Sequence, residues 1–324
     1  DDIVKIKAKR LGVFMEPYVL CVDSGGSKCV IRAVRPDGTF LAEYSGETSR
    51  HHGLEEAEVV RRIERTVDAC LAQFGGKREA CLAVAAGVSG IDSDEDAAIV
   101  DRIYHSLKGF SCPIRCLNDA ELTHYAVTGG VGVLVISGTG SIAYGKNAAG
   151  ESARVGGWVF TIMSDEGSGS YISRQALHHF SRYLDGCAEE TELVRLVKKR
   201  VGISTRKELM DLCIQLGTPP WTLPRLSIEV DEAAAAGDPY ALAILEDAAR
   251  CTFRLADILV QKLRLYEEAQ FKVGVWGSAI VKSQYHFSEF CRLFHEKYDN
   301  VSVVKPQKDA ADGACRLALE MIGK

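Results

Sequence analysis

The chain has 324 residues, of which 47% are hydrophobic and 26% are charged. This is the composition of an ordinary globular protein, and the length suggests about two domains. A formal net charge of −5 gives no reason to expect nucleic acid as a partner. The chain has no apolar run of about 18 residues, and its first residues lack the apolar core of a secretory signal. We therefore expect a cytoplasmic protein with no membrane partner.

The eleven cysteines are scattered along the chain, and no two of them have C-x-x-C spacing. Most stand in apolar runs, as Cys21 does between Leu20 and Val22. Cysteines in such positions are typical of small core residues in a reducing compartment. We therefore predict neither disulfides nor a cysteine-ligated metal centre, and this includes the loosely spaced pair Cys112 and Cys116.

Apolar runs of strand length alternate with stretches of helical period along the whole chain. The first predicted helix, for example, carries Ile63, Val67 and Leu71 on one face. In chain order we expect strands at 18–22, 29–34 and 39–44, a helix near 60–74, a strand at 81–86, a helix at 94–107, a strand at 114–117, a helix at 120–127, strands at 132–136, 142–145 and 152–155, a mostly helical stretch from 170 to about 265, a strand at 271–276, a helix at 288–297, a strand at 301–304 and a helix at 309–321.

The second half of the chain repeats the order of the first. Each half begins with a strand, a glycine turn, a strand, a second turn and a third strand. Asp23 and Ser137 lie 114 positions apart, and so do Ser27 and Ser141. A unit that occurs twice in one chain predicts a duplicated α/β architecture.

The glycine turns at 23–28 and 137–141 have the composition of phosphate-binding loops. Glycines let backbone N–H groups come close to a phosphate chain, and serine or threonine adds a hydroxyl donor. Neither turn matches the P-loop or the dinucleotide-binding pattern, and either one alone is more often a plain hairpin turn. Because they occur as a pair, we predict that both bind a polyphosphate, with Asp23 holding Mg²⁺ through water.

Several short motifs resemble those of the actin-like ATPase and sugar kinase superfamily. VDSGGSK at 22–28 resembles its first phosphate motif, SGTGS at 137–141 its second, and VGVWGS at 273–278 its adenosine motif. Together with NDA at 118–120, GGW at 156–158 and DEGSG at 165–169, their order more closely resembles the N-acetylglucosamine kinase branch, the BadF/BadG group. The resemblance covers about residues 18–319.

This resemblance implies an α/β fold of two ribonuclease-H-like (actin-like ATPase) domains, whose duplicated strand–turn–strand–turn–strand units face a central cleft. The N-terminal domain, 18–128, is completed by a C-terminal helix at 307–324, and the second domain, 129–306, carries a helical insertion. The implied activity is ATP- and Mg²⁺-dependent phosphorylation of an N-acetylated amino sugar, N-acetylglucosamine or N-acetylmuramic acid, at O6, by a homodimer. The implied ATP-binding residues are Ser24, Gly25, Gly26, Ser27, Lys28, Gly138, Thr139, Gly140, Gly277 and Ser278.

Asp119 is the candidate catalytic base. It follows the apolar strand at 114–117, at the end of the sheet where open α/β folds bind ligands. The resemblance implies the same role. Aspartate is also a favoured helix N-cap, and the residues alone leave the two interpretations equal.

The resemblance also implies which residues hold the sugar. They are Asn118, Asp119, Thr139, Gly140, Gly157, Trp158, Asp165 and Ser168. To these we add Arg50 and His51, from the loop after the third strand, as predicted sugar-binding residues. The segment 165–170 precedes a helix expected at 171–183, so helix capping is an alternative interpretation of its acidic residues. The family's Gly-Asp-Glu-Gly has a serine at its first position here, Ser164, which we expect to alter the backbone but not the role of Asp165.

Arg50 stands about where the family commonly has an asparagine beside the N-acetyl group. Its planar fork of donors suits a carboxylate, so we hypothesise a contact with an anionic substituent such as the lactyl group of N-acetylmuramic acid. A solvated surface arginine is equally compatible with the sequence. His51 and His52 are not expected to share a metal ion, because adjacent residues of an extended chain point in opposite directions.

Two other functions use the same scaffold. An ATPase activator of a radical 2-hydroxyacyl-CoA dehydratase carries a cysteine-ligated iron–sulfur cluster, and no cysteine occurs here between Ser141 and Tyr183. A non-catalytic sugar-binding sensor has no need of the base Asp119. The sequence therefore favours the kinase.

Overall fold

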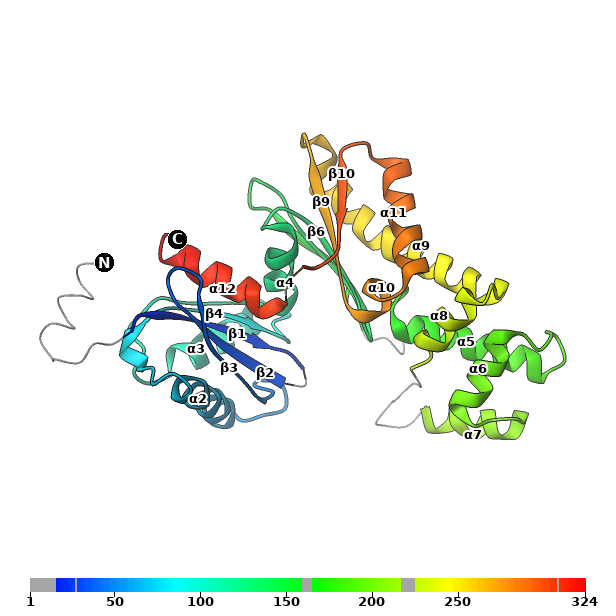
Figure 1. Cartoon of the computed structure of the whole chain (residues 1–324), viewed down its shortest axis with the longest axis horizontal. Coiled ribbons are helices and arrows are strands. Elements are labelled where there is room, and N and C mark those ends of the chain that lie inside the picture. The colour runs from blue at the N-terminus through cyan, green and yellow to red at the C-terminus, as the bar shows by residue number, and fades with distance from the viewer. Residues whose placement is uncertain (1–15, 27, 159–164, 217–224, 308) are drawn as a thin grey trace, which may run out of the picture. The chain divides into compact units, whose positions relative to one another are not determined.

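The computed structural model of the chain describes residues 16–26, 28–158, 165–216, 225–307 and 309–324. The chain forms two compact units, one made of the residues up to 129 together with 307–324 and the other of residues 130–306 (Figure 1). Each unit is built on a five-stranded sheet with helices packed against it.

The sheet of the first unit has the strand order β3-β2-β1-β4-β5. Its first three strands form an antiparallel meander, and β4 and β5 continue the sheet parallel to β1. The strands are β1 (Tyr18–Ser24), β2 (Lys28–Val34), β3 (Phe40–Glu47), β4 (Cys81–Val88) and β5 (Ile114–Asn118).

Helices cover both faces of this sheet. They are α2 (Glu56–Ala72), α3 (Asp94–His105), α4 (Asp119–Thr128) and α12 (Ala310–Met321), with a short 3-10 turn at Arg78–Ala80. Along β1, Leu20 and Val22 pack into a core with α2 and α3, whereas Val19 and Cys21 pack into a second core with α4 and α12. Both faces of β1 are therefore buried, as expected for an inner strand of a sheet with parallel pairing.

The second unit is built on the same plan, with the strand order β10-β9-β6-β7-β8. β6, β7 and β8 are antiparallel, and β9 and β10 continue the sheet parallel to β6. The strands are β6 (Gly132–Ser137), β7 (Ser141–Lys146), β8 (Ser152–Gly156), β9 (Phe271–Trp276) and β10 (Val301–Val304). If β6 replaces β1 and the later strands follow in order, the two sheets have one topology, which confirms the predicted duplicated α/β architecture.

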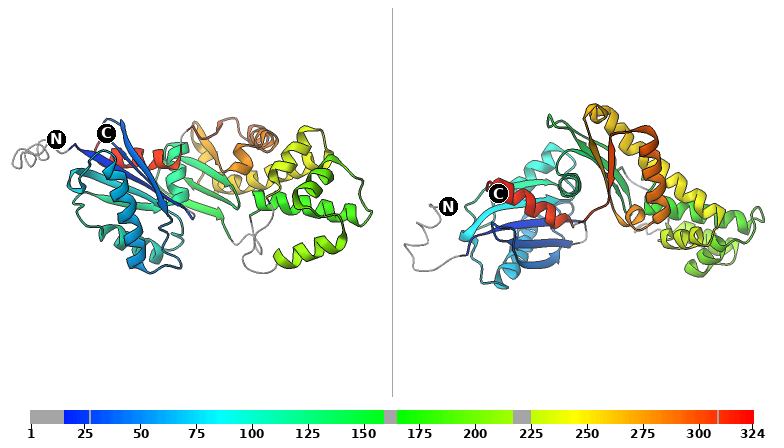
Figure 2. Two further views of the ribbon diagram at one scale, coloured as in Figure 1. Left: turned by 60° about the horizontal axis from the view of Figure 1, so that its bottom comes forward. Right: turned by 45° about the horizontal axis from the view of Figure 1, so that its top comes forward.

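Most helices of the second unit form a lobe beside its sheet (Figures 1 and 2). In α9, Leu245 packs into the core of this lobe, whereas Leu259 packs with Phe290 and Phe294 of α11 in the core beneath the sheet. The helices are α5 (Gly169–Leu184), α6 (Glu192–Val201), α7 (Arg206–Leu216), α8 (Ser227–Ala235), α9 (Pro239–Lys262), α10 (Ser278–Val281) and α11 (Gln284–Lys297), with a 3-10 turn at Leu265–Glu267.

Element boundaries agree with the predictions best for the last two strands, whereas the buried strands β1 and β4 each continue two residues beyond their predicted ends. The strands predicted at 271–276 and 301–304 have the bounds observed for β9 and β10. The helix predicted from Ser288 begins instead at Gln284, because the Ser283 hydroxyl accepts a hydrogen bond from the His286 N–H at 3.2 Å and caps it. Ser283 stands before the apolar pattern begins, so the pattern alone places the start of this helix too late.

All eleven cysteines are free thiols, and five of them are buried. Among the described helices, none has both the length and the apolar character needed to span a bilayer.

A single arginine joins the C-terminal helix to the sheet of the first unit. On β2, Arg32 Nε donates to Glu43 Oε2 at 2.7 Å, Nη2 donates to Asp309 Oδ2 at 2.7 Å, and Nη1 donates to Asp312 Oδ1 at 2.9 Å. Asp309 and Asp312 also form the capping box of α12. The Arg32 side chain is only 13% exposed, so it is far better shielded from water than an ordinary surface ion pair.

We expect Arg32→Ala to destabilise the first unit by about 2 kcal/mol, because three carboxylates lose a shared, partly buried donor. Arg32→Lys should recover part of this loss, since an ammonium cannot reproduce the fork. All three tryptophans lie in the second unit, so tryptophan fluorescence would not report on the first unit. Urea unfolding is therefore followed by circular dichroism. Arg61→Ala, which removes a 64% exposed arginine, is the control, and equal midpoints for Arg32→Ala and Arg61→Ala would contradict the prediction.

Candidate active site

Parallel pairing brings the carboxyl ends of three strands to one edge of the first sheet. Ser24 of β1 pairs with Val88 of β4, and Val88 pairs with Asn118 of β5. The Ser89 N–H donates to the Ser24 carbonyl at 2.9 Å and extends this pairing by one residue. The glycine turn after β1 and Asp119 after β5 therefore lie at the same edge.

Two hydroxyl groups from the segment after β3 hold the first glycine turn. Thr48 Oγ1 donates to the Gly25 carbonyl at 2.8 Å, and the buried Ser24 and Ser49 hydroxyl oxygens lie 2.7 Å apart. A Cβ built on Gly26 meets nothing within 4 Å, so the outer side of the turn is open to a ligand.

The remaining residues of this turn differ in how far they can be described. Lys28 is exposed at the start of β2. Ser27, which the sequence also assigned to ATP, lies outside the described residues. Thr48 and Ser49 were not predicted as part of the site, because two hydroxyl residues in a loop have no recognisable spacing. Their role becomes visible only when β3 pairs with β2 and carries them beside β1.

Asn118 and Asp119 stand where β5 passes into α4. Asn118 is the N-cap: its Oδ1 accepts from the Ala120 N–H at 2.8 Å, and its Nδ2 donates to the Ile91 carbonyl at 2.9 Å. Asp119 is the first residue of the helix and not its N-cap, but its Oδ1 also accepts from the Ala120 N–H at 2.8 Å, so the two side chains share that donor. Both ends of the Asn118 amide, which was predicted to contact sugar, are engaged within the unit.

The carboxyl group of Asp119 is partly shielded from water. Burial raises its pKa above the ordinary aspartate value, and the negative charge of Asp92 adds to the effect. A carboxylate with a raised pKa is a stronger base than an ordinary surface aspartate. This environment suits the predicted role in accepting a proton.

Asp23, the predicted Mg²⁺ residue, lies at the same edge. Its pKa is raised to about 6, first by burial and then by the charges of Asp119 and Asp309, while Lys28 and Arg32 act in the opposite direction. Carboxylates that repel one another in this way are stabilised when a divalent cation neutralises them. The donor set therefore fits Mg²⁺ in water-mediated contact.

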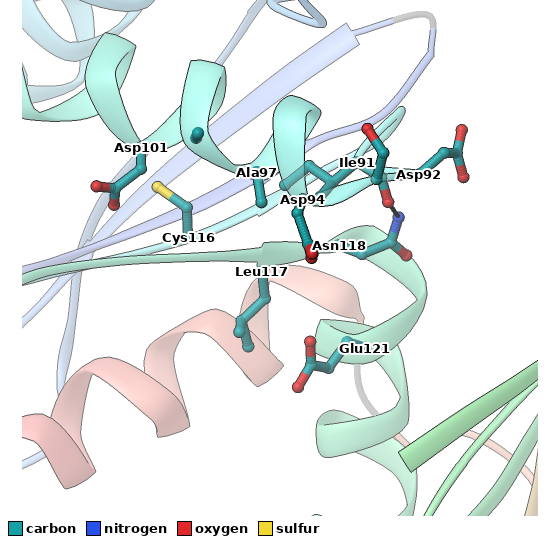
Figure 3. Close-up of a pocket in the computed structure, with 11 residues that line it drawn as sticks. Ile91, Asp92, Asp94, Ala97, Asp101, Cys116, Leu117, Asn118 and Glu121 are labelled. Atoms are coloured by element: carbon teal, nitrogen blue, oxygen red, sulfur yellow. Dashed lines mark hydrogen bonds between the residues drawn. The ribbon is translucent and has the colours of Figure 1, made fainter.

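A pocket of about 550 Å³ opens beside this edge (Figure 3). Its walls come from the loop before α3, from α3 itself and from the β5–α4 junction. Four acidic residues line it, Asp92, Asp94, Asp101 and Glu121, whereas Asp119 is not part of its lining. Carboxylates accept hydrogen bonds from hydroxyl groups and repel anions, so this pocket suits a neutral polyol better than a phosphate.

The segment after β3 corrects one prediction. His51 and His52 were expected to point apart, but the chain turns here and their ring centroids lie only 4.1 Å apart. Both rings approach the same carboxylate: Asp96 Oδ1 lies 2.8 Å from His51 Nε2 and 3.4 Å from His52 Nε2. The rule for an extended strand was wrong because β3 has ended at Glu47. His51, predicted to contact sugar, is buried against Asp96, whereas Arg50 is exposed.

In the second unit, the turn between β6 and β7 is held from behind by the start of α5. The Gly138 N–H donates to the Gly140 carbonyl at 2.9 Å and closes the turn. The Gly169 N–H donates to the Gly138 carbonyl at 2.8 Å, and the Ser170 N–H donates to the Thr139 carbonyl at 3.2 Å. Thr139 is exposed at the tip, where its hydroxyl is accessible to a ligand.

Asp165 completes this support in a strained conformation. Its φ of 75° is uncommon for a residue other than glycine, and its Oδ1 accepts from the Ser141 N–H at 2.7 Å. A Cβ at Gly140 would lie 2.8 Å from that same oxygen, so this turn position requires glycine. Asp165 therefore positions the turn, whatever further contact its second oxygen makes.

The other residues predicted to contact sugar in this unit differ in exposure. Ser168 is fully buried and caps α5, accepting from the Tyr171 N–H at 3.1 Å, so its hydroxyl is used in the fold. The Gly157 N–H donates to the Ser141 carbonyl at 3.0 Å and so links β8 to the same turn. Trp158 is 66% exposed, and an aromatic ring this open to solvent can stack on a ligand.

The predicted adenosine motif lies next to the phosphate turn. Ile136 of β6 pairs in parallel with Trp276 of β9, so both strands end at the same edge of the sheet. Gly277 has a φ of 90°, and a Cβ there would lie 2.4 Å from the Ser137 carbonyl oxygen. The two turns are thus in backbone contact through a glycine, and Ser278 stands exposed beyond them.

Residues 20–318 match the BadF/BadG/BcrA/BcrD ATPase family. The chain belongs to this family. It is 31% identical over 305 residues to the N-acetylmuramic acid/N-acetylglucosamine kinase of Clostridium acetobutylicum, and the alignment covers 93% of this chain and 98% of the relative. It is 28% identical over 308 residues to the N-acetyl-D-glucosamine kinase of Dictyostelium discoideum, which covers 92% and 96% of the two chains.

Solved structures of this class share the fold. A candidate N-acetylglucosamine kinase from Chromobacterium violaceum has a TM-score of 0.70 and 27% identity, over 94% of this chain and 99% of its own. The ROK hexokinase from Thermus thermophilus has a TM-score of 0.61 at 15% identity, over 95% and 100% of the two chains, and so shares the fold alone. The predicted family and fold class are therefore confirmed.

The raised pKa of Asp23 leads to a prediction about stability. Its pKa of about 6 in the folded state lies above the ordinary aspartate pKa of 3.8, so the folded state resists ionisation and stability falls as the pH rises between these values. We expect Asp23→Asn to stabilise the first unit by about 1–3 kcal/mol at pH 7.5, and by less at pH 4.5.

Urea unfolding followed by circular dichroism at the two pH values measures this gain. The matched control is Asp37→Asn in the exposed β2–β3 turn, which should give no stabilisation at pH 7.5. If Asp23→Asn changes the midpoint equally at both pH values, Asp23 does not have a raised pKa.

Proposed function

We propose that this protein is an ATP-dependent kinase that phosphorylates an N-acetylated amino sugar, N-acetylglucosamine or N-acetylmuramic acid, at O6. The observation that carries the proposal is the full-length match to relatives named as kinases of these sugars, in a chain with a shielded carboxylate at Asp119. The same relatives favour a kinase over an ATPase activator or a sugar sensor. A cytoplasmic homodimer remains part of the proposal.

The turns of both units have the chemistry that a nucleotide requires. Gly25 and Gly26 in the first unit and Thr139 and Gly140 in the second are proposed to donate backbone N–H groups to the phosphates of ATP, while Gly138, whose N–H closes the turn, is proposed to line the same site. The exposed Thr139 hydroxyl adds a donor, and Gly277 with Ser278 is proposed to lie against adenosine. Asp23 would hold Mg²⁺ through water, and the bound ion would supply positive charge that offsets the charge developing on the phosphates.

In the proposed reaction, Asp119 accepts the proton of the sugar hydroxyl. The hydroxyl oxygen forms a bond to the γ-phosphorus while the bond from that phosphorus to the bridging oxygen breaks, ADP leaves with the electron pair, and the proton passes to Asp119 late in the same step. A base of modest strength is sufficient, because the proton moves late in a loose transition state. The positioning of Asp119 by the capped start of α4 is the contribution of the fold.

We propose that Arg50 selects for an anionic sugar. Its side chain is exposed, and its backbone lies between Ser49, which contacts the β1 strand end, and His51, which contacts α3. Because the backbone is anchored on both sides of Arg50, its guanidinium is well placed to form paired hydrogen bonds with a carboxylate. The lactyl carboxylate of N-acetylmuramic acid is the group proposed for it.

We expect Asp119→Asn to lower kcat by about 10²–10⁴-fold, because the amide cannot accept the proton. The substitution is nearly isosteric, the N-cap of α4 is Asn118, and an amide oxygen at position 119 can still accept from the Ala120 N–H, so sugar affinity and folding should change little. Sugar-dependent ADP release gives kcat, and calorimetry gives the affinity. Asp37→Asn is the control, and a kcat within threefold of wild type would exclude Asp119 as the base.

We expect Arg50→Ala to lower kcat/KM for N-acetylmuramic acid by about 10–100-fold, and to change that for N-acetylglucosamine by less than about threefold. A selective loss is expected because only the first sugar carries a carboxylate. Arg61→Ala, another exposed arginine of the same unit, is the control. An equal loss with both sugars would assign Arg50 a general role, and no loss with either would remove it from the site.

A further inference from the structure

Two histidines and one aspartate of the first unit converge on one point. We propose that His51, His52 and Asp96 bind a divalent transition-metal ion, with zinc as the best match. One possible ligand atom from each residue lies within 4.8 Å of the others. The inference goes beyond the proposed kinase function and does not depend on it, because the magnesium proposed to accompany ATP lies at Asp23.

Two of the separations between possible ligand atoms, both to Asp96 Oδ1, are close to those of a tetrahedral site. With metal–ligand bonds of about 2.0–2.2 Å, two ligand atoms of a tetrahedral zinc ion stand about 3.3 Å apart. The separation between His52 Nε2 and Asp96 Oδ1 is 3.4 Å and already fits. The separation between His51 Nε2 and the same oxygen is 2.8 Å and needs to open by about half an ångström.

Asp96 is oriented as a ligand that binds through one oxygen. Its Oδ2 accepts from the Ser93 hydroxyl at 2.7 Å and from the Asp92 N–H at 3.1 Å. Hydrogen bonds of this kind fix a metal-binding carboxylate and leave its other oxygen for the ion. That other oxygen, Oδ1, is the one that both imidazoles approach.

The donor set also matches zinc chemically. Two imidazoles and one carboxylate form the three-ligand set of open zinc sites, in which water occupies the fourth position. The side chain of His52 is 50% exposed, so an ion can enter from solvent. Both rings approach the same oxygen of Asp96, and their centroids lie 4.1 Å apart.

An ion in this position would connect two parts of the first unit. Ser49 already contacts Ser24 of β1, and the ion would tie the next residues along the chain to α3. Arg50 lies between these two attachments. The site is therefore a structural clamp on the segment 49–52, and its ion has no direct part in phosphoryl transfer.

Binding of Co²⁺ tests the proposal, because cobalt substitutes for zinc and absorbs visible light in a tetrahedral site. The full-length protein is stripped with a chelator and titrated without nucleotide. We expect one Co²⁺ per chain, displaced by Zn²⁺, and binding at least about 100-fold weaker in His52→Ala. His52 is half-exposed, so the variant should fold. The variant keeps all eleven cysteines, so any Co²⁺ bound adventitiously to thiols would still be seen in it.

Asp96→Asn is the second variant. Its amide oxygen can still accept from Ser93 and Asp92, while its nitrogen replaces the ligand oxygen, so the same loss of affinity is expected. His105→Ala on α3, which removes a single histidine paired with Asp101 at 3.3 Å, is the matched control and should bind as wild type does. Wild-type affinity in both site variants, or binding weaker than about 1 mM in every protein, would overturn the proposal.

Discussion

The candidate site depends on the parallel pairing of β1 with β4, β4 with β5, and β6 with β9. Parallel strands all end at the same edge, so the chain leaves each sheet where a ligand can be met by several segments far apart in sequence. This is why Gly25 and Asp119 share an edge in the first unit, and why Gly277 touches the Ser137 carbonyl in the second. The meander strands add hairpin turns to the same edges without further crossovers.

The first edge concentrates negative charge. Asp23 and Asp119 both have raised pKa values, and each has burial as its main cause, with a neighbouring carboxylate contributing. A fold selected only for stability would replace such a pair with neutral groups. The second unit carries a backbone constraint instead, because Asp165 is held at a φ of 75° by its hydrogen bond to Ser141. Both features are understandable if the edges bind a cation and polyphosphate.

The sequence predicted the repeated units, the buried strands and the edge positions of the glycine turns, because these depend on local pattern and on strand order. It could not assign the cap at Asn118 rather than Asp119, since two neighbouring residues with equal capping propensity differ only in the backbone that tertiary packing imposes. The capping role of Ser168 and the support by Thr48 and Ser49 are of the same kind. Each depends on a partner that pairing brings close from elsewhere in the chain.

The segment 48–52 shows how such partners can join separate roles in one loop. Thr48 and Ser49 attach it to the glycine turn of β1, and His51 attaches it to α3. Arg50 lies between these attachments and is the one residue of the three at 49–51 that remains exposed. A long side chain on a backbone anchored at both sides loses less conformational freedom on binding than one on a free loop. If Arg50 has the role proposed for it, substrate selectivity depends on the residues that anchor this segment as well as on the arginine itself.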